Sequence, residues 1–439
     1  MNSIPEIDSD NKRTVLLDLP DFCLDLILRS LTLKELAVVA NSNKYLNERA
    51  NCVFKLNKFP RELKTKDYSQ TEYDDFASIL RAFAAQIDYV KINSDDNQKL
   101  IDALVEHCSQ SLPILSVDVK KVSNRELIIS QPFMKLTTLT YWFDDSTFDE
   151  FWLTKMNEWF PMLELLYLRF QKPFSKTINQ IAYNNMKYLK WFHLSSSTDE
   201  SNDFDVFNFL KAGPLLVSLQ IIAKICWTHM HKLELSNLKY LDIKFFDNVN
   251  AIYKFITKCH NLSLLNIDLN QKPFNLSDVL ADQLSSLKLT SLRLQNGTNL
   301  SLHGATNLEN LRDLDISAEE YLDIQHIQLP HLNQLTIKLT KDMDSIIMFI
   351  ENCRNLMWLT LKFGADLSLK SSHFQRLTET LIELKCLDSI QCYGVIDEDL
   401  AKSLQSIPKN LLQKLHCSIS CSSRCASTTL AHDRQDNDF

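Results

Sequence analysis

Aliphatic residues recur along most of the chain with the spacing Leu-x-x-Leu-x-Leu, in which other aliphatic and a few aromatic residues replace leucine. The last two positions of each copy alternate with their neighbours, so they point to one face of a short strand. The centres of successive copies lie 21 to 31 residues apart. Because leucine is common, one match means little, but a near-regular succession predicts an internal repeat.

Some copies of the repeat are clear and others are weaker. The clear copies are centred on Leu241, Leu265, Leu292, Leu314, Leu335 and Leu359. Weaker copies upstream are centred on Val90, Leu115, Leu139, Leu166, Phe192 and Leu219. Two degraded copies close the series, at Leu381-Leu384-Cys386 and Leu412-Leu415-Cys417.

Amphipathic segments lie between the copies and predict helices, for example Val249 to His260 and Ser345 to Cys353. One strand and one helix cannot bury their own apolar faces, so such units must stack on each other. We therefore expect an α/β solenoid, in which a curved parallel sheet carries helices on its outer side.

The segment at residues 15–60 does not follow this period. One helical stripe, with the spacing i, i+3, i+4 and i+7, is formed by Leu24, Ile27, Leu28 and Leu31. Thr32 to Glu35 is a capping box that opens a second helix, and Tyr45 to Phe54 predicts a third, shorter element. Three short helices struggle to bury their apolar surface alone, so we expect part of it to contact a partner or the first repeat.

These patterns divide the chain into five segments. They are a disordered N-terminus at 1–14, a small helical module at 15–60, a linker at 61–75, the repeat solenoid at 76–417 and a disordered C-terminal tail at 418–439. The tail is predicted from its polarity and its lack of periodicity. Cys417, Cys421 and Cys425 at its start fit a terminal cap, a metal clip or a lipidation site, and the sequence does not decide among these.

Composition and charge exclude several classes of function. The net charge of −8 and the lack of a run of five basic residues argue against a nucleic-acid partner. The five glycines are too widely spaced for a phosphate-binding loop. The acidic N-terminus, the lack of a membrane-spanning stretch and the scattered cysteines predict a soluble, reduced protein with no membrane partner. We expect it in the cytoplasm, the nucleus or both.

No catalytic or metal site is predicted. The chain contains no Gly-x-Ser-x-Gly elbow and no His-Glu-x-x-His motif. His229 and His231, which follow Cys226, have a loose metal-ligand spacing, but no fourth ligand follows at a recognisable distance. We expect a protein that is not an enzyme and that needs no cofactor.

Two segments resemble known families. The repeats resemble leucine-rich repeats over roughly Phe76 to Cys417, although the Asn that this family places three positions after its last leucine is matched clearly only at Asn270. Without that Asn, the turns must satisfy their backbone groups in another way. The helical module resembles an F-box, on the residues Leu19-Pro20, Leu24, Ile27, Leu28, Leu31, Leu36 and Val39.

The combined resemblance implies the substrate-recognition subunit of a cullin-based, SCF-type ubiquitin ligase. In that family the F-box docks on a Skp-type adaptor, which links it to a cullin, and the repeats hold the protein to be ubiquitinated, so its effective concentration near the conjugating enzyme rises. The implied adaptor-binding residues are Leu19, Pro20, Leu24, Ile27, Leu28 and Leu31, although some of these leucines must also hold the helices together.

Two alternatives stay open. In the first, the N-terminal helices only cap the solenoid, and the chain is an adaptor-independent scaffold that binds proteins. In the second, the repeats hold a small molecule in their concavity. The sequence does not name the protein substrate, say whether phosphorylation or a small ligand is needed, or fix the number of repeats at either end.

The strand residues that flank the paired aliphatics are expected on the concave face, where a substrate would bind. Exposed aromatic rings and arginine are the side chains that most often make protein interfaces tight. The predicted substrate-binding residues are Trp142, Tyr167, Arg169, Trp191, Tyr240, Arg293 and Trp358. A structural role, in which these rings pack against neighbouring strands, is the competing interpretation.

Overall fold

The computed structural model describes twenty stretches of the chain. They are residues 16–57, 59, 61–65, 72–93, 98–119, 129–143, 150–170, 186–196, 206–223, 225, 227, 229–244, 249–270, 273–275, 287–302, 308–324, 327–339, 343–363, 371–393 and 418–420. The chain divides into two units, of which the first comprises residues 1–175 and 180–189 and the second residues 176–179 and 190–439.

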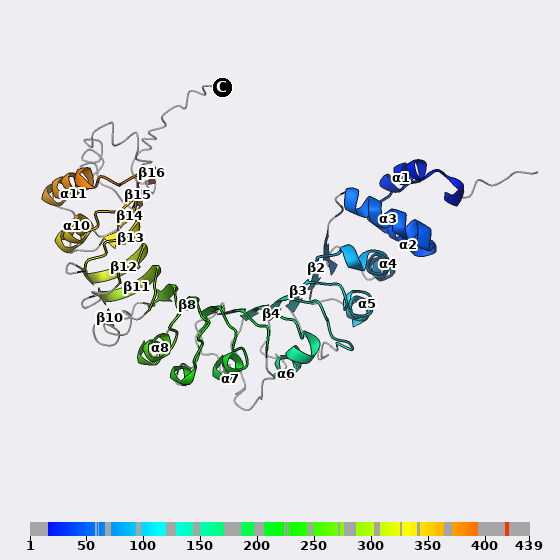
Figure 1. The fold of residues 1–439 in the computed structure, drawn as a ribbon, viewed down its shortest axis with the longest axis horizontal. Coiled ribbons are helices and arrows are strands. Elements are labelled where there is room, and N and C mark those ends of the chain that lie inside the picture. Colours follow the sequence, from blue (N-terminus) through cyan, green and yellow to red (C-terminus); the bar gives the residue numbers. More distant parts are fainter. Residues whose placement is uncertain are drawn as a thin grey trace, which may run out of the picture. The chain divides into compact units, whose positions relative to one another are not determined.

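The first unit begins with three helices and continues with strands that alternate with helices. Its elements are α1 (Asp21–Arg29), α2 (Leu33–Ser42), α3 (Lys44–Leu56), β1 (Glu62–Lys64), α4 (Tyr73–Phe83), β2 (Tyr89–Asn93), α5 (Gln98–Cys108), β3 (Ile114–Val119), β4 (Thr138–Phe143), α6 (Glu150–Trp159) and β5 (Leu165–Phe170). The strands pair in sequence order and all run parallel. Helices α4, α5 and α6 lie on the same face of this sheet (Figure 1).

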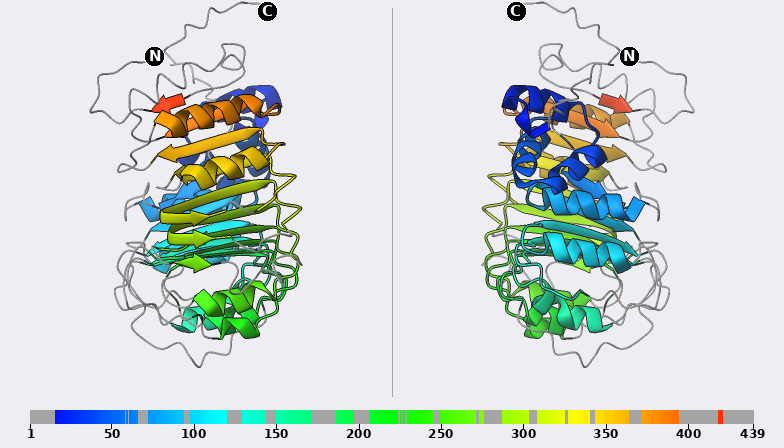
Figure 2. Two further views of the ribbon diagram at one scale, coloured as in Figure 1. Left: turned by 90° about the vertical axis from the view of Figure 1, so that its left-hand side faces the viewer. Right: turned by 90° about the vertical axis from the view of Figure 1, so that its right-hand side faces the viewer.

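The second unit repeats the same arrangement over a longer stretch. Its elements are β6 (Trp191–Ser196), α7 (Val206–Lys211), β7 (Ser218–Ile222), β8 (Tyr240–Lys244), α8 (Val249–Ile256), β9 (Leu264–Asp268), β10 (Phe274–Asn275), β11 (Ser291–Ser301), β12 (Asp313–Asp323), β13 (Gln334–Leu339), α10 (Met343–Asn352), β14 (Trp358–Phe363), α11 (Ser371–Glu383), β15 (Ser389–Tyr393) and β16 (Ser418–Ser420). Neighbouring strands are again parallel, and the short β10 pairs beside β11. Figure 2 shows β11 to β14 side by side, with α10 packed against these strands and α11 beside α10.

The aliphatic positions of the repeat form the core of both sheets. Val90, Leu115, Leu139 and Leu166 align across β2 to β5 and are at most 2% exposed. A second column of buried residues crosses the second unit, through Phe192, Leu219, Leu241, Leu265, Leu292, Leu314, Leu335, Leu359 and Ile390. The predicted α/β class, with repeated parallel strands and helices, is therefore confirmed.

The two degraded copies at the C-terminal end were assigned in the wrong register. Leu381 is a buried residue of α11, and the strand that follows carries Ile390 and Cys392. The leucines near the end of α11 are spaced for helix packing, and this spacing happens to match the Leu-x-x-Leu-x-Leu pattern of the strands. Ile419 of β16 aligns with Cys392, so the pairing lies two residues beyond the predicted Cys417. The predicted tail therefore cannot begin at 418, and the tail residues 421–439 lie outside the described residues.

The predicted linker is also partly wrong. Residues 61–75 contain β1, in which Leu63 aligns with Val90 of β2, and they contain the first turn of α4. The aliphatic pattern missed this strand because Thr65, which is buried, occupies the position where a third aliphatic residue was required. The predicted disordered N-terminus at 1–14 lies outside the described residues.

A shared backbone acceptor at the start of each strand joins successive repeats. The carbonyl of Lys239, which immediately precedes β8, accepts from the N–H groups of Ser263 and Leu264 of the next repeat, both at 2.9 Å. The same bifurcated bond is made by the carbonyls of Arg61, Pro113, Thr137, Lys190, Val217, Ser263, Thr290, Arg312, Asn333 and Met357. The side-chain amides of Asn261 and Asn355 add two further bonds to the preceding repeat, to the carbonyls of Ser236 at 2.7 Å and Pro330 at 2.5 Å. Asn270 adopts a left-handed conformation, with φ of 46°, and its N–H donates to the Asp268 carboxylate.

The three predicted N-terminal helices are confirmed as α1, α2 and α3, but α3, with 13 residues, is the longest and not the shorter element that was predicted. Thr32 and Glu35 form the predicted capping box, in which the Thr32 N–H donates to the Glu35 carboxylate at 2.8 Å. Helix α2 also packs on α4. The Asn41 side chain donates to the carbonyl of Ser78 at 2.9 Å. The helical module and the first repeat are therefore continuous parts of one unit.

Candidate protein-binding surfaces

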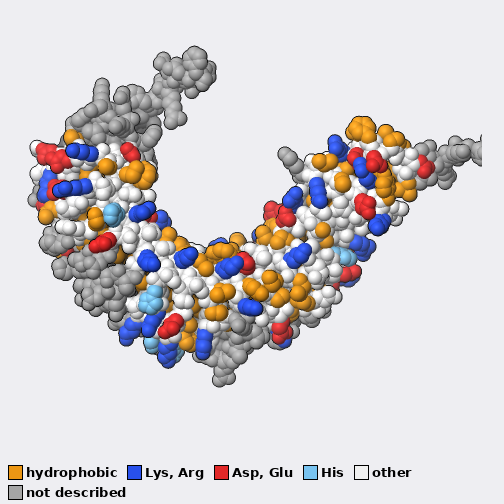
Figure 3. Space-filling model, viewed as in Figure 1, with side chains coloured by type: hydrophobic (Ala, Val, Ile, Leu, Met, Phe, Trp, Pro, Cys, Tyr) orange, Lys and Arg blue, Asp and Glu red, His pale blue; other side chains and the backbone are white. Residues whose placement is uncertain are grey.

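Helix α1 is apolar on both of its sides. Leu24 and Leu28 are fully buried. On the opposite arc, successive positions at 100° per residue are Phe22, Leu26, Cys23 and Ile27, all exposed. Phe22 is 72% exposed, Leu26 50% and Ile27 40%, and hydrophobic side chains gather over α1 in the space-filling view (Figure 3). An outer helix face normally carries polar residues, so this surface, called here the α1 patch, suits a partner.

Salt bridges fix α1 in the orientation that exposes this patch. Arg49 of α3 donates from Nε to Asp25 at 3.0 Å and pairs through Nη1 with Asp21 at 3.2 Å. Tyr45 of α3 also donates to Asp21. Because both aspartates face α3, the remaining arc of the helix is left to its apolar residues.

The implied adaptor-binding residues divide into two groups. Leu24 and Leu28 belong to the core, so their assignment to the adaptor-binding surface is wrong. Fully buried side chains cannot contact a partner. Ile27 and Pro20 are exposed, and Leu19 and Leu31 are half-buried. The regular stripe had marked the packed side of the helix, whereas the most exposed ring, Phe22, stands outside that stripe.

The open face of each sheet, opposite the buried aliphatics, carries polar side chains. One row is especially regular, because the residue between the second and third aliphatic of every repeat is polar. From β2 to β15 it consists of Lys91, Ser116, Thr140, Tyr167, His193, Gln220, Asp242, Asn266, Arg293, Asp315, Thr336, Thr360 and Gln391. The alternation of polar and aliphatic residues in the sequence predicts this row. Only the register of neighbouring strands shows which of its side chains touch each other.

In the first unit, two cations lie over one tryptophan of the open face. Trp142 of β4 aligns with Asp118 of β3 and with Arg169 of β5. The Lys91 ammonium lies 5.1 Å and the Arg169 guanidinium 5.0 Å from the centre of a Trp142 ring. Lys91 also pairs with Asp118 at 3.5 Å. We call Lys91, Trp142 and Arg169 the cation stack.

In the second unit, the same face carries a hydrogen-bonded polar chain. His193 contacts the Gln220 side chain, and the Gln220 amide donates to Asp242 at 2.7 Å. Asn266 and Tyr240 donate to the same carboxylate at 2.9 and 3.1 Å. Burial raises the pKa of Asp242, and the three hydrogen bonds partly oppose that shift. Asp242 is only 9% exposed.

The predicted substrate-binding residues all lie on strands and on the open face. The structure brings together Trp142 and Arg169, with Tyr167 two residues before Arg169 on β5. Trp191 and Tyr240 flank Ser218, which aligns with both. Within the second unit Trp358 lies five strands from Tyr240.

Arg293 of β11 aligns with Asn266 and lies 3.5 Å from the Asp313 carboxylate. The predicted residues therefore form separate clusters and not one continuous patch. Sequence reasoning omitted Gln220 and Asn266, which have no aromatic ring or charge to draw attention.

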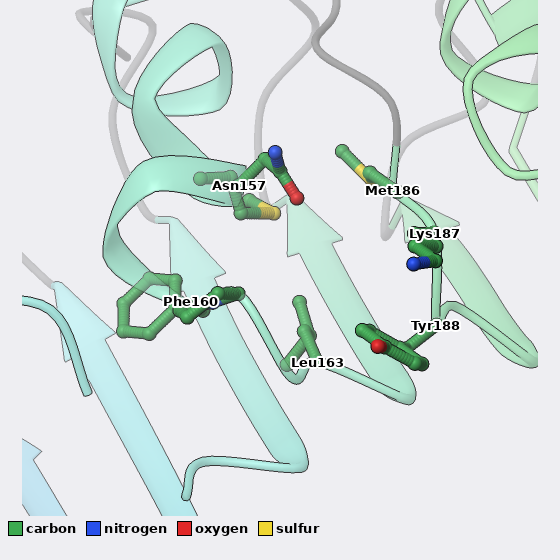
Figure 4. A pocket seen from close by; sticks show the side chains of 8 residues that line it. Asn157, Phe160, Leu163, Met186, Lys187 and Tyr188 are labelled. Carbon is green, nitrogen blue, oxygen red and sulfur yellow. The ribbon is translucent and has the colours of Figure 1, made fainter. Parts of the chain in front are cut away.

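A small pocket lies away from the open face. It measures about 10 Å³, which is room for about one water molecule, and lies between the end of α6 and the segment before β6, where Met156, Asn157, Phe160 and Leu163 face Met186 and Tyr188 (Figure 4). Small-molecule sites usually occupy about 300 Å³ or more. The pocket is therefore too small to hold an organic ligand.

The candidate metal ligands are not brought together in the described part of the chain. His229 precedes and His231 lies within a short 3₁₀ turn, Met230–Lys232, and Cys226 lies outside the described residues. Nowhere among the described residues do three or more His, Cys, Asp or Glu side chains converge on a metal position. Of the helices that the structure describes, none has both the length and the apolar character needed to cross a bilayer. Cys417, Cys421 and Cys425 lie outside the described side chains.

Comparison with known proteins gives no relative. No protein-family model matches the sequence, and no curated protein is significantly similar to it.

Proposed function

We propose that this chain is the substrate-recognition subunit of a cullin-based, SCF-type ubiquitin ligase. In this proposal α1 to α3 form an F-box-like module that docks on a Skp-type adaptor and through it on a cullin. The parallel strands and helices form a leucine-rich-repeat solenoid that holds the protein to be ubiquitinated. The chain itself makes and breaks no bonds, and it acts in the cytoplasm, the nucleus or both.

The observation that carries this proposal is the α1 patch. Burying one large apolar side chain contributes about 1.5–3 kcal/mol, so a nine-residue helix with Phe22, Leu26 and Ile27 facing solvent leaves a large contribution unused. Interfaces concentrate binding energy in a few such side chains at their centre. An apolar groove between helices of an adaptor suits this surface, because an amphipathic helix binds a groove through residues spaced as Phe22 and Leu26 are.

The open faces support the second half of the proposal. Trp191 and Trp358 are 41% and 46% exposed on strands of the second unit. Arg293 and Lys362 are exposed beside Asp313 and Asp315, at 3.5 and 3.7 Å. Exposed indole rings among charges of both signs suit a protein partner, since Trp and Arg dominate the energetics of such contacts.

An adaptor-independent scaffold is the second candidate, because one observation favours it. Helix α2 packs on α4, Lys34 lies 3.4 Å from Asp75, and Asn41 bonds to Ser78. That packing is what a terminal cap of a solenoid requires. A cap, however, needs a polar outer surface, and it does not account for the α1 patch.

The test is co-purification of a Skp-type adaptor with the full chain. Replacing both Phe22 and Leu26 by Ser is expected to abolish adaptor capture, because it removes two exposed anchors and leaves the buried Leu24 and Leu28 intact. Thermal unfolding of this variant is expected to match that of the unmodified chain.

The matched control replaces Met134 and Met162 by Ser. These residues are 44% and 39% exposed in the same unit but lie outside the helical module. Their replacement is expected to leave adaptor capture unchanged. Equal capture by the Phe22 and Leu26 variant, or no capture by the unmodified chain, would favour the scaffold instead.

A further inference from the structure

The cation stack of the first unit holds an arginine in a form suited to binding. The Arg169 guanidinium lies over the Trp142 ring at 5.0 Å. Stacking uses the face of the guanidinium and leaves its N–H groups, which point outward in its plane, available for hydrogen bonds. A half-buried arginine fixed by a ring loses less side-chain freedom on binding than one that is mobile.

Hydrogen-bond donors exceed acceptors at this stack. The Trp142 Nε1 atom is buried and has no hydrogen-bond acceptor. Among the described residues, no carboxylate lies within ion-pair distance of Arg169, whereas Lys91 pairs with Asp118 at 3.5 Å. A buried donor without an acceptor costs about 1–3 kcal/mol. The stack therefore presents the Arg169 guanidinium, which has no carboxylate partner among the described residues, beside a buried indole N–H that is also without an acceptor.

The charge balance at the stack identifies the type of group that complements it. Lys91 and Arg169 supply two positive charges and Asp118 one negative charge, so one positive charge remains in excess. A single carboxylate neutralises this excess, whereas a phosphoryl dianion exceeds it. The carboxylate also matches the guanidinium in shape, because its two oxygens accept two parallel N–H···O bonds.

We infer that Lys91, Trp142 and Arg169 recognise an Asp or Glu side chain of the protein that the repeats bind. Arg169 donates to the carboxylate, Trp142 holds the guanidinium in place, and Lys91 adds positive charge from the strand two positions away. This inference rests on the proposed function only in that the repeats hold a protein. It adds that the bound segment is acidic where it crosses β4 and β5.

Selection of peptides from a random phage-displayed library, with the full chain as bait, tests the inference. Selected peptides are expected to be enriched in Asp and Glu relative to the starting library. The enrichment is expected to disappear with Arg169→Gln, which keeps polarity but removes the charge. The matched control is Arg293→Gln on the open face of the second unit, where Asp313 already pairs with the arginine, and it is expected to keep the acidic enrichment.

Synthetic peptides then separate a carboxylate from other anions. The most enriched peptide is prepared with Glu, Gln or phosphoserine at the enriched position, and its dissociation constant is measured by fluorescence anisotropy. We expect the Gln peptide to bind about tenfold more weakly than the Glu peptide, as for a hydrogen bond to a charged group. Arg169→Lys is expected to recover only part of the loss, because Lys cannot form the bidentate pair.

Three results would overturn the inference: no selectable peptide, acidic enrichment that survives Arg169→Gln, or tighter binding of phosphoserine than of Glu. Adaptor co-purification with the same Arg169 variant is expected to be unchanged, because Arg169 lies outside the helical module. A failure to select any peptide with the unmodified chain, together with intact adaptor capture, would count against this inference alone. Intact peptide selection without adaptor capture would count against the ligase proposal alone.

Discussion

The open faces of the two units are built from the same arrangement of strands, but their polar side chains differ in whether they have partners. In both, side chains that alternate with buried aliphatics project from neighbouring parallel strands in register. In the first unit, the Trp142 N–H has no acceptor and Arg169 no carboxylate partner among the described residues. In the second unit, the buried Asp242 carboxylate is surrounded by donors from Gln220, Tyr240 and Asn266.

The difference teaches that position on the face does not by itself make a binding residue. A buried polar group whose partners lie on adjacent strands contributes to stability and is costly to remove. A polar group left without partners is available to a ligand and costs little to replace. Three variants test this distinction, and the first is expected to have the largest effect.

Replacing Asp242 by Leu is expected to destabilise the second unit by about 2–4 kcal/mol, since three donors lose their common acceptor inside a poorly solvated site. Urea unfolding followed by circular dichroism measures the change. Lys338→Leu, on the same face and half-buried, serves as the control and is expected to shift stability by at most about 0.5 kcal/mol.

Thiol labelling in the same variant locates the effect. Burial raises the pKa of Cys108 in the first unit and of Cys259 in the second to about 12, so each reacts only when its surroundings open. Asp242→Leu is expected to speed alkylation of Cys259 and to leave Cys108 unchanged. Equal acceleration at both cysteines would remove the distinction between the units.

The pH dependence of stability gives a smaller effect with a defined sign. Folding raises the pKa of Asp242 above its ordinary value of 3.8. The folded protein therefore holds the proton of the Asp242 carboxyl group more tightly than the unfolded chain does. Its contribution to stability is therefore greatest below about pH 3.8 and falls as the pH rises through the folded pKa.

Asp242→Asn removes this titration. We expect the unfolding free energy of the unmodified chain, minus that of the Asn variant, to fall as the pH is raised from 3.5 to about 7. Subtraction cancels the groups that titrate equally in both proteins. A difference that is constant with pH, or that rises, would mean that Asp242 is not held in a poorly solvated site.

Arg169→Gln is expected to change stability least, by less than about 1 kcal/mol, because an exposed cation–π contact contributes about 0.5–1 kcal/mol. Urea unfolding under the same conditions as for Asp242→Leu measures it. A loss as large as that of Asp242→Leu would mean that Arg169 also has a structural role, and the two faces would no longer differ.

Much of the fold follows from the sequence, because burial on one side of a strand requires aliphatics at fixed spacing. That rule located the strands centred on Val90 to Leu359. The rule failed where a polar residue occupies a buried strand position, and where leucines with the strand spacing belong to a helix. Buried Thr65 concealed β1, and Leu381 of α11 displaced the predicted strand that became β15.

The candidate sites were harder to predict, for two physical reasons. A regular helical stripe marks the side that packs against its own protein, so Leu24 and Leu28 were assigned to a partner, while Phe22 outside the stripe was overlooked. Contacts such as that between Gln220 and Asp242 depend on the register of neighbouring strands. Register joins residues more than twenty positions apart, and no local pattern records it.

The bifurcated bond between repeats gives the array a direction. Each later repeat supplies the pair of N–H groups, and each earlier repeat supplies the oxygen. A fragment cut after β14 would leave the Met357 carbonyl open to water, whereas a fragment that starts at β9 would expose the amides of Ser263 and Leu264 at its first edge. Deletions from the C-terminal side therefore free backbone acceptors at the new edge, and deletions from the N-terminal side that end just before Ser263 free backbone donors.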